Sequence, residues 1–508
     1  PLEGFFLNCN KEFMDKFILA IDAGTTSSRA ILFDKNASAV EIAQYEFNQI
    51  FPKEGWVEHD AIEILNTQLK AIRDVINNSK IDPNNIDSVG ITNQRETTVI
   101  WNKKTGKPVY NAIVWQDRRT ASFCDDLIKN NKTELIQNKT GLVIDAYFSG
   151  TKIKWILDSD PKIRSQANDG ELLFGTIDTW LIWNLTNGKS HITDPSNASR
   201  TLLYNIKKDS WDNELLSLFD IPKNILPNVV DSSSISAHID AKIFGAKIPI
   251  SGIAGDQQAA LFGQLCTEEG DIKNTYGTGC FCMMNTGKTF VKSNNKMLST
   301  IAWRINGEVT YALEGSVFVA GALIQWLRDK LGIIKDAPEV ENLANTVKDN
   351  GGITFVPALS GLAAPYWDPY AQGTIFGITR GTENGHIARA ALESIALRTR
   401  DIIIEMEKDA GIKFSSLKVD GGASNNNLLM QIQSDLLNTW VIRPKTTETT
   451  ALGIAFLAGL ATGFWKDIPS LKSLWIEDRS FKPNQENESE QLVEIWNKRI
   501  KKVLRIYE

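Results

Sequence analysis

The sequence predicts an α/β protein built from two similar domains. The chain has 508 residues, more than a single hydrophobic core usually organises. Short apolar, strand-like runs alternate with stretches of helical spacing. An apolar strand that leads into a glycine turn occurs at 18–34 and again at 274–285. This recurrence indicates an internal duplication.

The first of these turns has the composition of a phosphate-binding loop. Residues 18–34 read as two strands joined by a polar turn, and Gly24 lets the backbone approach a ligand closely. Asp22, at the end of the first strand, is placed where a metal ion would meet bound phosphates. An ordinary turn rich in Thr and Ser explains the motif equally well when it is taken alone. Hydroxyl groups that suit phosphate oxygens come from Thr25, Thr26 and Ser27.

Composition argues against several classes of protein. The net charge of −6 provides no basic footprint for nucleic acid. Five cysteines without a C-x-x-C pair, and only four histidines, argue against a zinc site and favour a reducing compartment. We therefore expect a cytoplasmic protein. The longest apolar run, 451–465, is too short to span a membrane and predicts a buried helix.

The first residues are expected to lie outside the fold. Residues 1–13 lack the basic start of a signal peptide. The first strand follows closely on Met14, which looks like the natural start. We therefore treat 1–13 as a non-native leader.

Polar loops between strands mark candidate sites in the N-terminal half. Asp60 is a good N-cap for a helix over 62–76. The segment 87–101 reads as strand, loop and strand, and its loop carries Arg95 and Glu96. A surface ion pair is the simplest interpretation of these adjacent charges, but flanking strands would hold the pair rigidly, as binding loops require.

The next candidates flank the predicted domain boundary. The segment 113–119 suggests another strand edge, in which Trp115 reads first as a core residue. The apolar segment 248–255 predicts a strand that ends at a glycine turn with Asp256, and a helix is expected to follow this turn. We expect the boundary near Gly263, which divides the chain into domains 14–263 and 264–508.

The C-terminal half repeats the theme. A second glycine turn falls at 277–279 and a third at 420–423. Three such turns in one chain are typical of a nucleotide held between two similar domains. Further helices are expected from about Thr151 and over 388–408, and an amphipathic helix over 490–507.

Two segments imitate a P-loop. Residues 188–190 and 287–289 both read Gly-Lys-Ser/Thr, as the end of that motif does. The motif also needs a glycine five residues before its Gly-Lys, where this chain has Trp183 and Cys282. We therefore expect ordinary turns.

Taken together, the motifs make the chain similar to the FGGY family of carbohydrate kinases, within the sugar-kinase and actin-like ATPase superfamily. The resemblance is closest to the family members that phosphorylate glycerol. It covers the chain from Met14 almost to its end. The matching blocks are Asp-x-Gly-Thr-Thr-Ser-Ser-Arg at 22–29, Asn-Gln-Arg-Glu-Thr at 93–97, Val-Trp-Gln-Asp-Arg-Arg-Thr at 114–120, Gly-Asp-Gln-Gln-Ala-Ala-Leu-Phe-Gly at 255–263, Asn-Thr-Tyr-Gly-Thr-Gly-Cys-Phe at 274–281 and Asp-Gly-Gly-Ala-Ser-x-Asn at 420–426.

The resemblance implies a fold and a reaction. The fold is two RNase-H-like domains with a deep cleft between them. The reaction is ATP-dependent phosphorylation of glycerol to sn-glycerol 3-phosphate by direct in-line transfer, with Mg²⁺ bound by Asp22 and Asp256. No nucleic acid or membrane span is expected, and the protein would be a homodimer or a larger homo-oligomer.

The resemblance also implies roles for individual residues, with Asp256 as the general base. The polyol site would consist of Arg95, Glu96, Trp115, Tyr147, Asp256, Gln257 and Phe281. The ATP site would consist of Thr25, Thr26, Ser27, Arg29, Thr278, Gly321, Gln325, Gly422 and Asn426.

The chain departs from the family pattern at two places, and other functions stay open. Ala23 stands where glutamine is common, which matters little to a backbone cradle. The stretch 244–249 is short, whereas in relatives inhibited by fructose 1,6-bisphosphate it is longer, rich in glycine and ends in arginine. The alternatives are a family member acting on xylulose, ribulose or gluconate, an actin- or Hsp70-like ATPase, and a pseudokinase.

Overall fold

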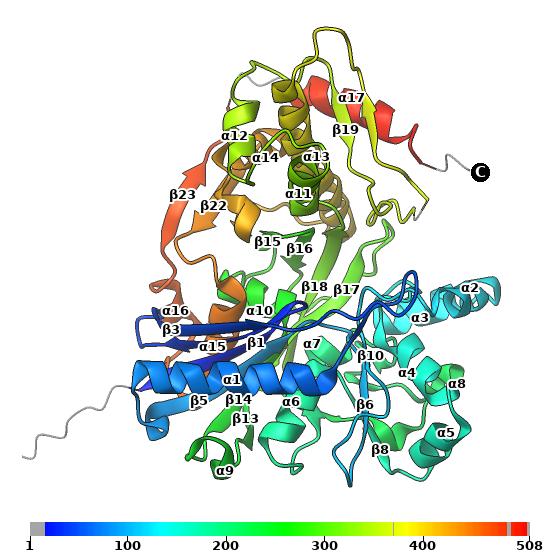
Figure 1. The fold of residues 1–508 in the computed structure, drawn as a ribbon, viewed down its shortest axis with the longest axis vertical. Coiled ribbons are helices and arrows are strands. Elements are labelled where there is room, and N and C mark those ends of the chain that lie inside the picture. Colours follow the sequence, from blue (N-terminus) through cyan, green and yellow to red (C-terminus); the bar gives the residue numbers. More distant parts are fainter. Residues whose placement is uncertain (1–15, 369, 485–488, 505–508) are drawn as a thin grey trace, which may run out of the picture.

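The computed structural model describes residues 16–368, 370–484 and 489–504. The predicted leader 1–13 and the end of the predicted tail helix lie outside these residues. Figure 1 shows two lobes along the long axis, the lower formed mainly by the N-terminal part of the chain. No helix within the described ranges is both long and apolar enough to cross a membrane.

One continuous sheet runs through both lobes. Its order, among the described residues, is β23 (Glu477–Phe481), β22 (Trp440–Pro444), β21 (Ser416–Asp420), β15 (Ile272–Tyr276), β16 (Cys280–Asn285), β18 (Glu308–Val317), β17 (Leu298–Ile305), β13 (Ser233–His238), β14 (Pro249–Gly255), β5 (Ile86–Asn93), β1 (Phe17–Ala23), β2 (Ser27–Phe33) and β3 (Ala39–Glu46). The two halves of the sheet are joined where β13 pairs with β17 at Ser233 and Ile305.

The sheet confirms the predicted duplication. In the N-terminal half, β1 pairs antiparallel with β2 and parallel with β5, which pairs parallel with β14. In the C-terminal half, β15 pairs antiparallel with β16 and parallel with β21, which pairs parallel with β22. Each half therefore has the same strand order around one glycine-turn hairpin, as expected of RNase-H-like domains.

Helices cover the sheet. Those of the lower lobe include α1 (Ala61–Ser79), α2 (Ala121–Lys129), α3 (Thr133–Thr140), α4 (Ser149–Asp158), α5 (Pro161–Asn168), α6 (Ile177–Leu185), α7 (Pro195–Ala198), α8 (Asn213–Phe219), α9 (Ala241–Phe244) and α10 (Asp256–Gly263). The later ones are α11 (Gly321–Asp329), α12 (Glu339–Ala344), α13 (Asn384–Ala410), α14 (Asn427–Leu437), α15 (Thr449–Thr462), α16 (Ile468–Lys472) and α17 (Ser489–Ile500). Figure 1 places α11 to α14 and α17 in the upper lobe.

Local sequence signals explain where helices begin. As predicted, the Asp60 carboxylate caps α1 by accepting a hydrogen bond from Ile62 N at 2.8 Å. The buried side of α1 includes Ile64, Ile72 and Val75, at the spacing of one helical face. Helix α4 begins at residue 149, two residues before the predicted start.

Helix α15 is buried because it leaves the C-terminal half and lies against the N-terminal strands. It contacts β1, β5, β14 and α10, and Figure 1 shows it in the lower lobe. A Cβ on Gly453 would lie 1.8 Å from Ala259 O, and one on Gly263 would lie 1.9 Å from Thr449 O. Only glycines allow this backbone contact, and it fixes α10, whose first residue is Asp256.

Most predicted elements are confirmed, and the differences are informative. Only Ile113 of the predicted edge 113–119 belongs to a strand, β7 (Ala112–Ile113), because Trp115 and its neighbours form a loop. Helix α13 extends beyond the predicted 388–408 at both ends. Residues 188–190 and 287–289 lie in turns and loops, which agrees with the rejection of a P-loop.

Candidate active site

The Arg95–Glu96 pair lies inside the protein. Both residues follow β5 in the connection to β6 (Val99–Asn102), and their residual exposures are 3% and 1%. The surface-pair interpretation is therefore wrong. Glu96 adopts φ of 60°, a conformation that non-glycine residues seldom take outside constrained sites. Ser149 Oγ donates to its carbonyl oxygen at 2.9 Å and helps to hold this turn.

The Arg95 guanidinium is held by three acidic or hydroxyl partners. Its Nη1 and Nη2 bind the two carboxylate oxygens of Glu314, with Nη2 to Oε1 at 3.1 Å. Its Nε lies 3.1 Å from Asp256 Oδ1, and Nη2 donates to the Tyr147 hydroxyl at 3.4 Å. Two predicted polyol-site residues, Asp256 and Tyr147, therefore meet at a third, Arg95.

Asp256 begins helix α10 at the end of β14. Its Oδ1 accepts a hydrogen bond from Gln257 N at 2.7 Å and is the atom that faces Arg95. Its Oδ2 has no hydrogen bond to any described residue. Burial raises the pKa of Asp256, Arg95 opposes this, and the nearby charge of Asp22 adds to the increase. A carboxylate with a raised pKa is a better proton acceptor.

Gln257 is oriented by a buried lysine. Lys273 Nζ donates to Gln257 Oε1 at 2.6 Å and to Thr275 Oγ1 at 2.7 Å. The Gln257 amide nitrogen is thereby left to act as the donor toward a ligand. Burial lowers the pKa of Lys273, while the charges of Asp420 and Asp256 oppose this decrease.

Three aromatic rings lie together beside these polar groups. The Trp115 ring is edge-on to Tyr147 at 5.6 Å and to Phe281 at 6.4 Å between centroids. All three residues are only half-buried, so Trp115 is not a plain core residue. The loops that carry Trp115 and Tyr147 are tied by Arg118 and Asp145, whose closest atoms, Nη1 and Oδ1, are 2.6 Å apart.

The first glycine turn is surrounded by defined contacts. Asp22 Oδ2 lies 3.1 Å from Arg29 Nη2, and Glu448 Oε2 lies 2.6 Å from Arg29 Nη1. Arg29 is thus shared by two carboxylates. Gln49 Nε2 donates to Thr25 O at 3.1 Å, whereas Thr26 is exposed. Gln44 Nε2 donates to the Ser27 hydroxyl at 3.0 Å.

The second and third turns lie next to each other. Helix α11 starts on the second turn, with Gly321 N donating to Gly277 O at 3.0 Å and Ala322 N donating to Thr278 O at 3.0 Å. A Cβ on Gly421 would lie 2.6 Å from Tyr276 O, so the third turn abuts the end of β15.

Thr278, predicted to bind phosphate, and the predicted adenosine residues lie in or near these two turns. The Thr278 side chain is exposed, and so is Gln325 on α11. A Cβ on Gly422 would meet nothing within 4 Å, which leaves open space there. Asn426 uses its Oδ1 to cap α14 by accepting from Leu429 N at 2.8 Å.

The carboxylates near the first turn suit a magnesium ion. Burial raises the pKa of Asp22, and Arg29 opposes that increase. Asp22 and Asp256 are close enough to interact electrostatically, and such concentrated negative charge favours a divalent cation. No group of three or more His, Cys, Asp or Glu side chains that could hold a metal occurs in the described part of the chain. Mg²⁺ usually takes few carboxylates and keeps several waters.

Sequence reasoning missed the charged residues behind this site. Glu314 and Arg200 are fully buried, and Arg200 Nε donates to Glu96 Oε1 at 2.6 Å. Burial acts to raise the pKa of Glu314, but Arg200 and Arg95 lower it to about 2. The sequence did contain a signal for Glu314, because it is a carboxylate inside the apolar strand Tyr-Ala-Leu-Glu-Gly-Ser-Val at 311–317. A charge buried in such a strand needs charged partners.

Comparison with known proteins shows which proteins this chain is similar to. The chain is 58% identical over 490 residues to a glycerol kinase of Nitratidesulfovibrio vulgaris, covering 96% of this chain and 99% of the relative. It is 58% identical over 494 residues to a glycerol kinase of Alkaliphilus oremlandii, and the match covers 97% of this chain and 98% of the relative. The crystal structure of Plasmodium falciparum glycerol kinase with ADP superimposes on this structure with a TM-score of 0.91 at 38% sequence identity. The superposition covers 96% of this chain and 98% of that chain.

The two halves of the chain each match a family domain. Residues 17–263 match the N-terminal domain of the FGGY family of carbohydrate kinases. Residues 272–462 match the C-terminal domain of the same family. With a duplicated sheet, a glycine turn in each half and acidic and aromatic groups gathered between them, the chain belongs to the FGGY family of carbohydrate kinases.

Proposed function

We propose that this protein is a kinase that transfers the γ-phosphoryl group of ATP to glycerol, giving sn-glycerol 3-phosphate. The observation that carries the proposal is the meeting of Arg95, Asp256 and Tyr147 beside the Trp115 ring. Charged and hydroxyl groups match the hydroxyls of a small polyol, and the rings match its carbons. The relatives at 58% identity are named glycerol kinases.

Asp256 acts as the general base in this proposal. Its Oδ2 takes the proton of the terminal hydroxyl of glycerol as that oxygen attacks the γ-phosphorus, and the bond to the β–γ bridging oxygen breaks. Arg95 and Gln257 N hold Oδ1, so the reacting oxygen is fixed. This combines base catalysis with positioning.

Positioning of the other groups follows from their contacts. Arg95 donates to the glycerol hydroxyls, Glu96 accepts from them, Tyr147 adds its hydroxyl, and the Gln257 amide donates to another. Trp115 and Phe281 face the carbon chain. Two bulky rings leave little room for a five-carbon sugar, which disfavours xylulose or ribulose as the substrate.

The glycine turns hold the nucleotide in this proposal. Thr25, Thr26 and Ser27 bind phosphate from one side and Thr278 from the other, with Arg29 close to the first turn. Gly321, Gln325, Gly422 and Asn426 line the adenosine pocket. Mg²⁺, held by Asp22 and Asp256, would neutralise phosphate charge, and closure of the two domains, divided at residues 263 and 264, would exclude competing water.

A coupled assay of ADP release tests the proposal. We expect release to depend on glycerol and to saturate with it, while xylulose, ribulose and gluconate give far lower kcat/KM. Hydrolysis of ATP that ignores glycerol would contradict the proposal and favour an actin- or Hsp70-like ATPase. No turnover with any acceptor would indicate a pseudokinase.

The cellular setting is also a proposal. We place the enzyme in the cytoplasm, because the four described cysteines, Cys124, Cys266, Cys280 and Cys282, are free and buried. We further propose a homodimer or a larger homo-oligomer, on the family resemblance. Light scattering of the purified protein measures its mass, and a monomer at micromolar concentration would contradict that proposal.

A further inference from the structure

Glu314 links the two halves of the molecule at the base of the polyol site. It lies on β18, the neighbour of the C-terminal hairpin strand β16, and has no solvent exposure. Its partners Arg95 and Arg200 both belong to the N-terminal half. Oε1 accepts from Arg95 Nη2 at 3.1 Å and from Arg200 Nη2 at 3.0 Å, while Oε2 binds Arg95 Nη1.

The ion pair with Glu314 determines which edge of Arg95 faces Asp256 and Tyr147. A guanidinium is planar and presents two donor edges in fixed geometry. Glu314 occupies the edge formed by Nη1 and Nη2. The other edge, formed by Nε and Nη2, faces Asp256 Oδ1 at 3.1 Å and the Tyr147 hydroxyl at 3.4 Å. Because the group is rigid, fixing the first edge orients the second.

Glu314 also controls Glu96, through Arg200. Arg200 donates from Nε to Glu96 Oε1 at 2.6 Å and from Nη2 to Glu314 Oε1 at 3.0 Å. One edge of Arg200 therefore bridges the two carboxylates. In the described part of the chain, Glu96 Oε2 has no hydrogen bond, so it is the oxygen available to a ligand.

We propose that Glu314 is the positioning residue of the polyol site, holding the Nε edge of Arg95 and, through Arg200, the carboxylate of Glu96 toward the substrate hydroxyls. This role rests on the proposed function for the identity of the substrate. Glu314 itself touches no substrate. It joins the C-terminal strand to both polyol-binding side chains, so the site is complete only when the two halves are docked as they are here.

A merely structural ion pair predicts a different outcome. Breaking a buried pair destabilises a protein wherever it lies, without a selective effect on one substrate. A positioning role predicts weaker binding of the polyol with ATP binding preserved. Asp401 provides the matched comparison, since it is also a buried carboxylate whose Oδ2 lies 3.1 Å from Nη1 of an arginine, Arg398 on α13.

The test compares Glu314→Gln, Glu314→Asp and Asp401→Asn in the full chain. We expect Glu314→Gln to raise the KM for glycerol about tenfold or more, the scale of losing a hydrogen bond between charged groups, with the KM for ATP within about twofold. Glu314→Asp keeps the charge on a shorter side chain and should recover part of the loss. Asp401→Asn should lower the melting temperature and leave both KM values unchanged.

The proposal fails if Glu314→Gln and Glu314→Asp lower only the melting temperature, as Asp401→Asn does, or if they raise both KM values equally. Should Glu314→Gln not fold, Glu314→Asp decides by the same comparison of KM values. If the wild-type enzyme prefers another polyol, the same variants are measured with that polyol. Failure of the glycerol assignment is thus separated from failure of the role of Glu314.

Discussion

The indole nitrogen of Trp115 donates a hydrogen bond to the hydroxyl of Thr25 at 3.0 Å. This bond joins the aromatic side of the polyol site to the first glycine turn. The same Trp115 ring faces Phe281, which lies on β16 two residues after Gly279 of the second turn. The proposed substrate wall therefore contacts the first turn directly and, through Phe281, the strand that follows the second turn.

We predict that this bond contributes to turnover. Trp115→Phe keeps an aromatic wall and removes the donor, and Thr25→Val removes the acceptor. Each should lower kcat/KM about 2- to 10-fold, the effect of one neutral hydrogen bond. The double variant should be hardly worse than either single variant. Steady-state kinetics of the four proteins checks this, and fully additive losses would show that the two residues act independently.

Asp256→Asn should abolish most of the catalysis. The amide has nearly the same shape, but it cannot accept the proton and loses the charge that faces Arg95 Nε at 3.1 Å. We expect kcat to fall at least about 100-fold, as for loss of a general base, with little change in the KM for ATP. Turnover close to that of the wild type would remove Asp256 from the base role.

Gly255→Ala should disturb Arg95 without changing the charge of any residue. A Cβ at 255 would lie 2.7 Å from Cγ and Cδ of Arg95, whose ion pairs prevent it from moving freely. Overpacking of this kind costs about 1–3 kcal/mol, so the KM for glycerol should rise roughly 5- to 100-fold. Gly381→Ala is the control, since its Cβ would meet only Thr379 Oγ1 at 3.9 Å. Equal kinetics for the two variants would contradict the prediction.

Two buried histidines should contribute less to the stability of the fold as the pH falls below about 6.5. Burial lowers the pKa of His59 to about 4, and burial, opposed by a hydrogen bond with Phe174 O, lowers that of His191 to about 4. Their ordinary value is 6.5, so the unfolded chain takes up protons first as the pH falls. The contribution of each neutral, buried histidine to the free energy of unfolding is full above pH 6.5. It is lost as the pH falls toward 4, by up to roughly 3 kcal/mol per histidine.

Buried carboxylates act in the opposite direction, among them Asp22, Asp256 and Asp178, because burial raises the pKa of each. Burial raises the pKa of Asp178 to about 6 from 3.8, so its contribution is full below 3.8 and is lost as the pH rises through 6. Urea unfolding at several pH values measures the slope, and His191→Phe should flatten it between pH 6.5 and 4.5. An unchanged slope in that variant would contradict the assignment to His191.

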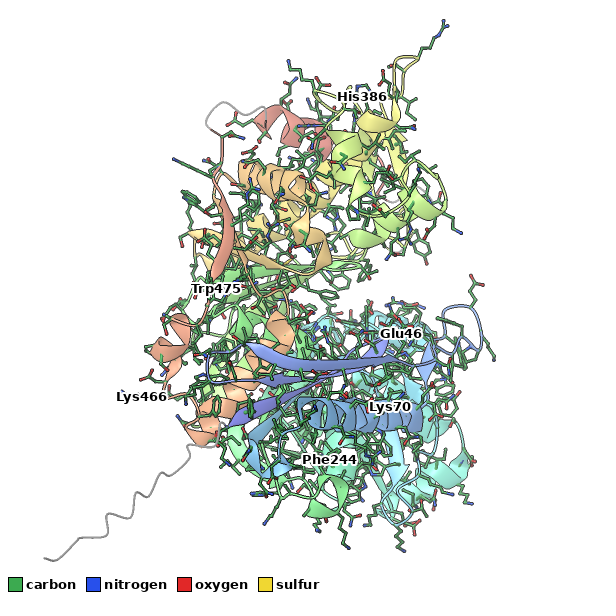
Figure 2. All side chains as sticks on the ribbon, turned by 60° about the vertical axis from the view of Figure 1, so that its left-hand side comes forward. Glu46, Lys70, Phe244, His386, Lys466 and Trp475 are labelled. Atoms are coloured by element: carbon green, nitrogen blue, oxygen red, sulfur yellow. The ribbon has the colours of Figure 1, made fainter. Side chains whose placement is uncertain are left out.

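Fructose 1,6-bisphosphate in the millimolar range should neither inhibit the enzyme nor enlarge its assembly. The stretch 236–247 contains no arginine, and its Asp240 caps α9 and pairs with Lys189 at 2.7 Å. Phe244 lies at the outer end of the lower lobe, remote from the upper lobe (Figure 2). A bisphosphate needs clustered donors, which arginine supplies better than lysine. Saturable inhibition with a shift in light scattering to a larger mass would overturn this prediction.

Local sequence determined the elements of this protein. Apolar runs, the Asp60 cap and the three glycine turns predicted the strands, helix α1 and the two hairpins, because these signals act between neighbouring residues. The residues gathered at Arg95 were foreseen from the family resemblance. Which of these residues contact one another could not be predicted from their spacing along the chain.

Tertiary structure alone decided how the site is held. Glu314 meets Arg95 across 219 positions of sequence and Arg200 meets Glu96 across 104, and no periodicity reports such distant partners. In the sequence, the adjacent charges of Arg95 and Glu96 indicate a surface ion pair. Because the pair is buried instead, it needs the charged partners Glu314 and Arg200. The sequence likewise predicted that helix α15 is buried, but not where it packs. The close contact between Gly453 and α10 places it in the opposite lobe.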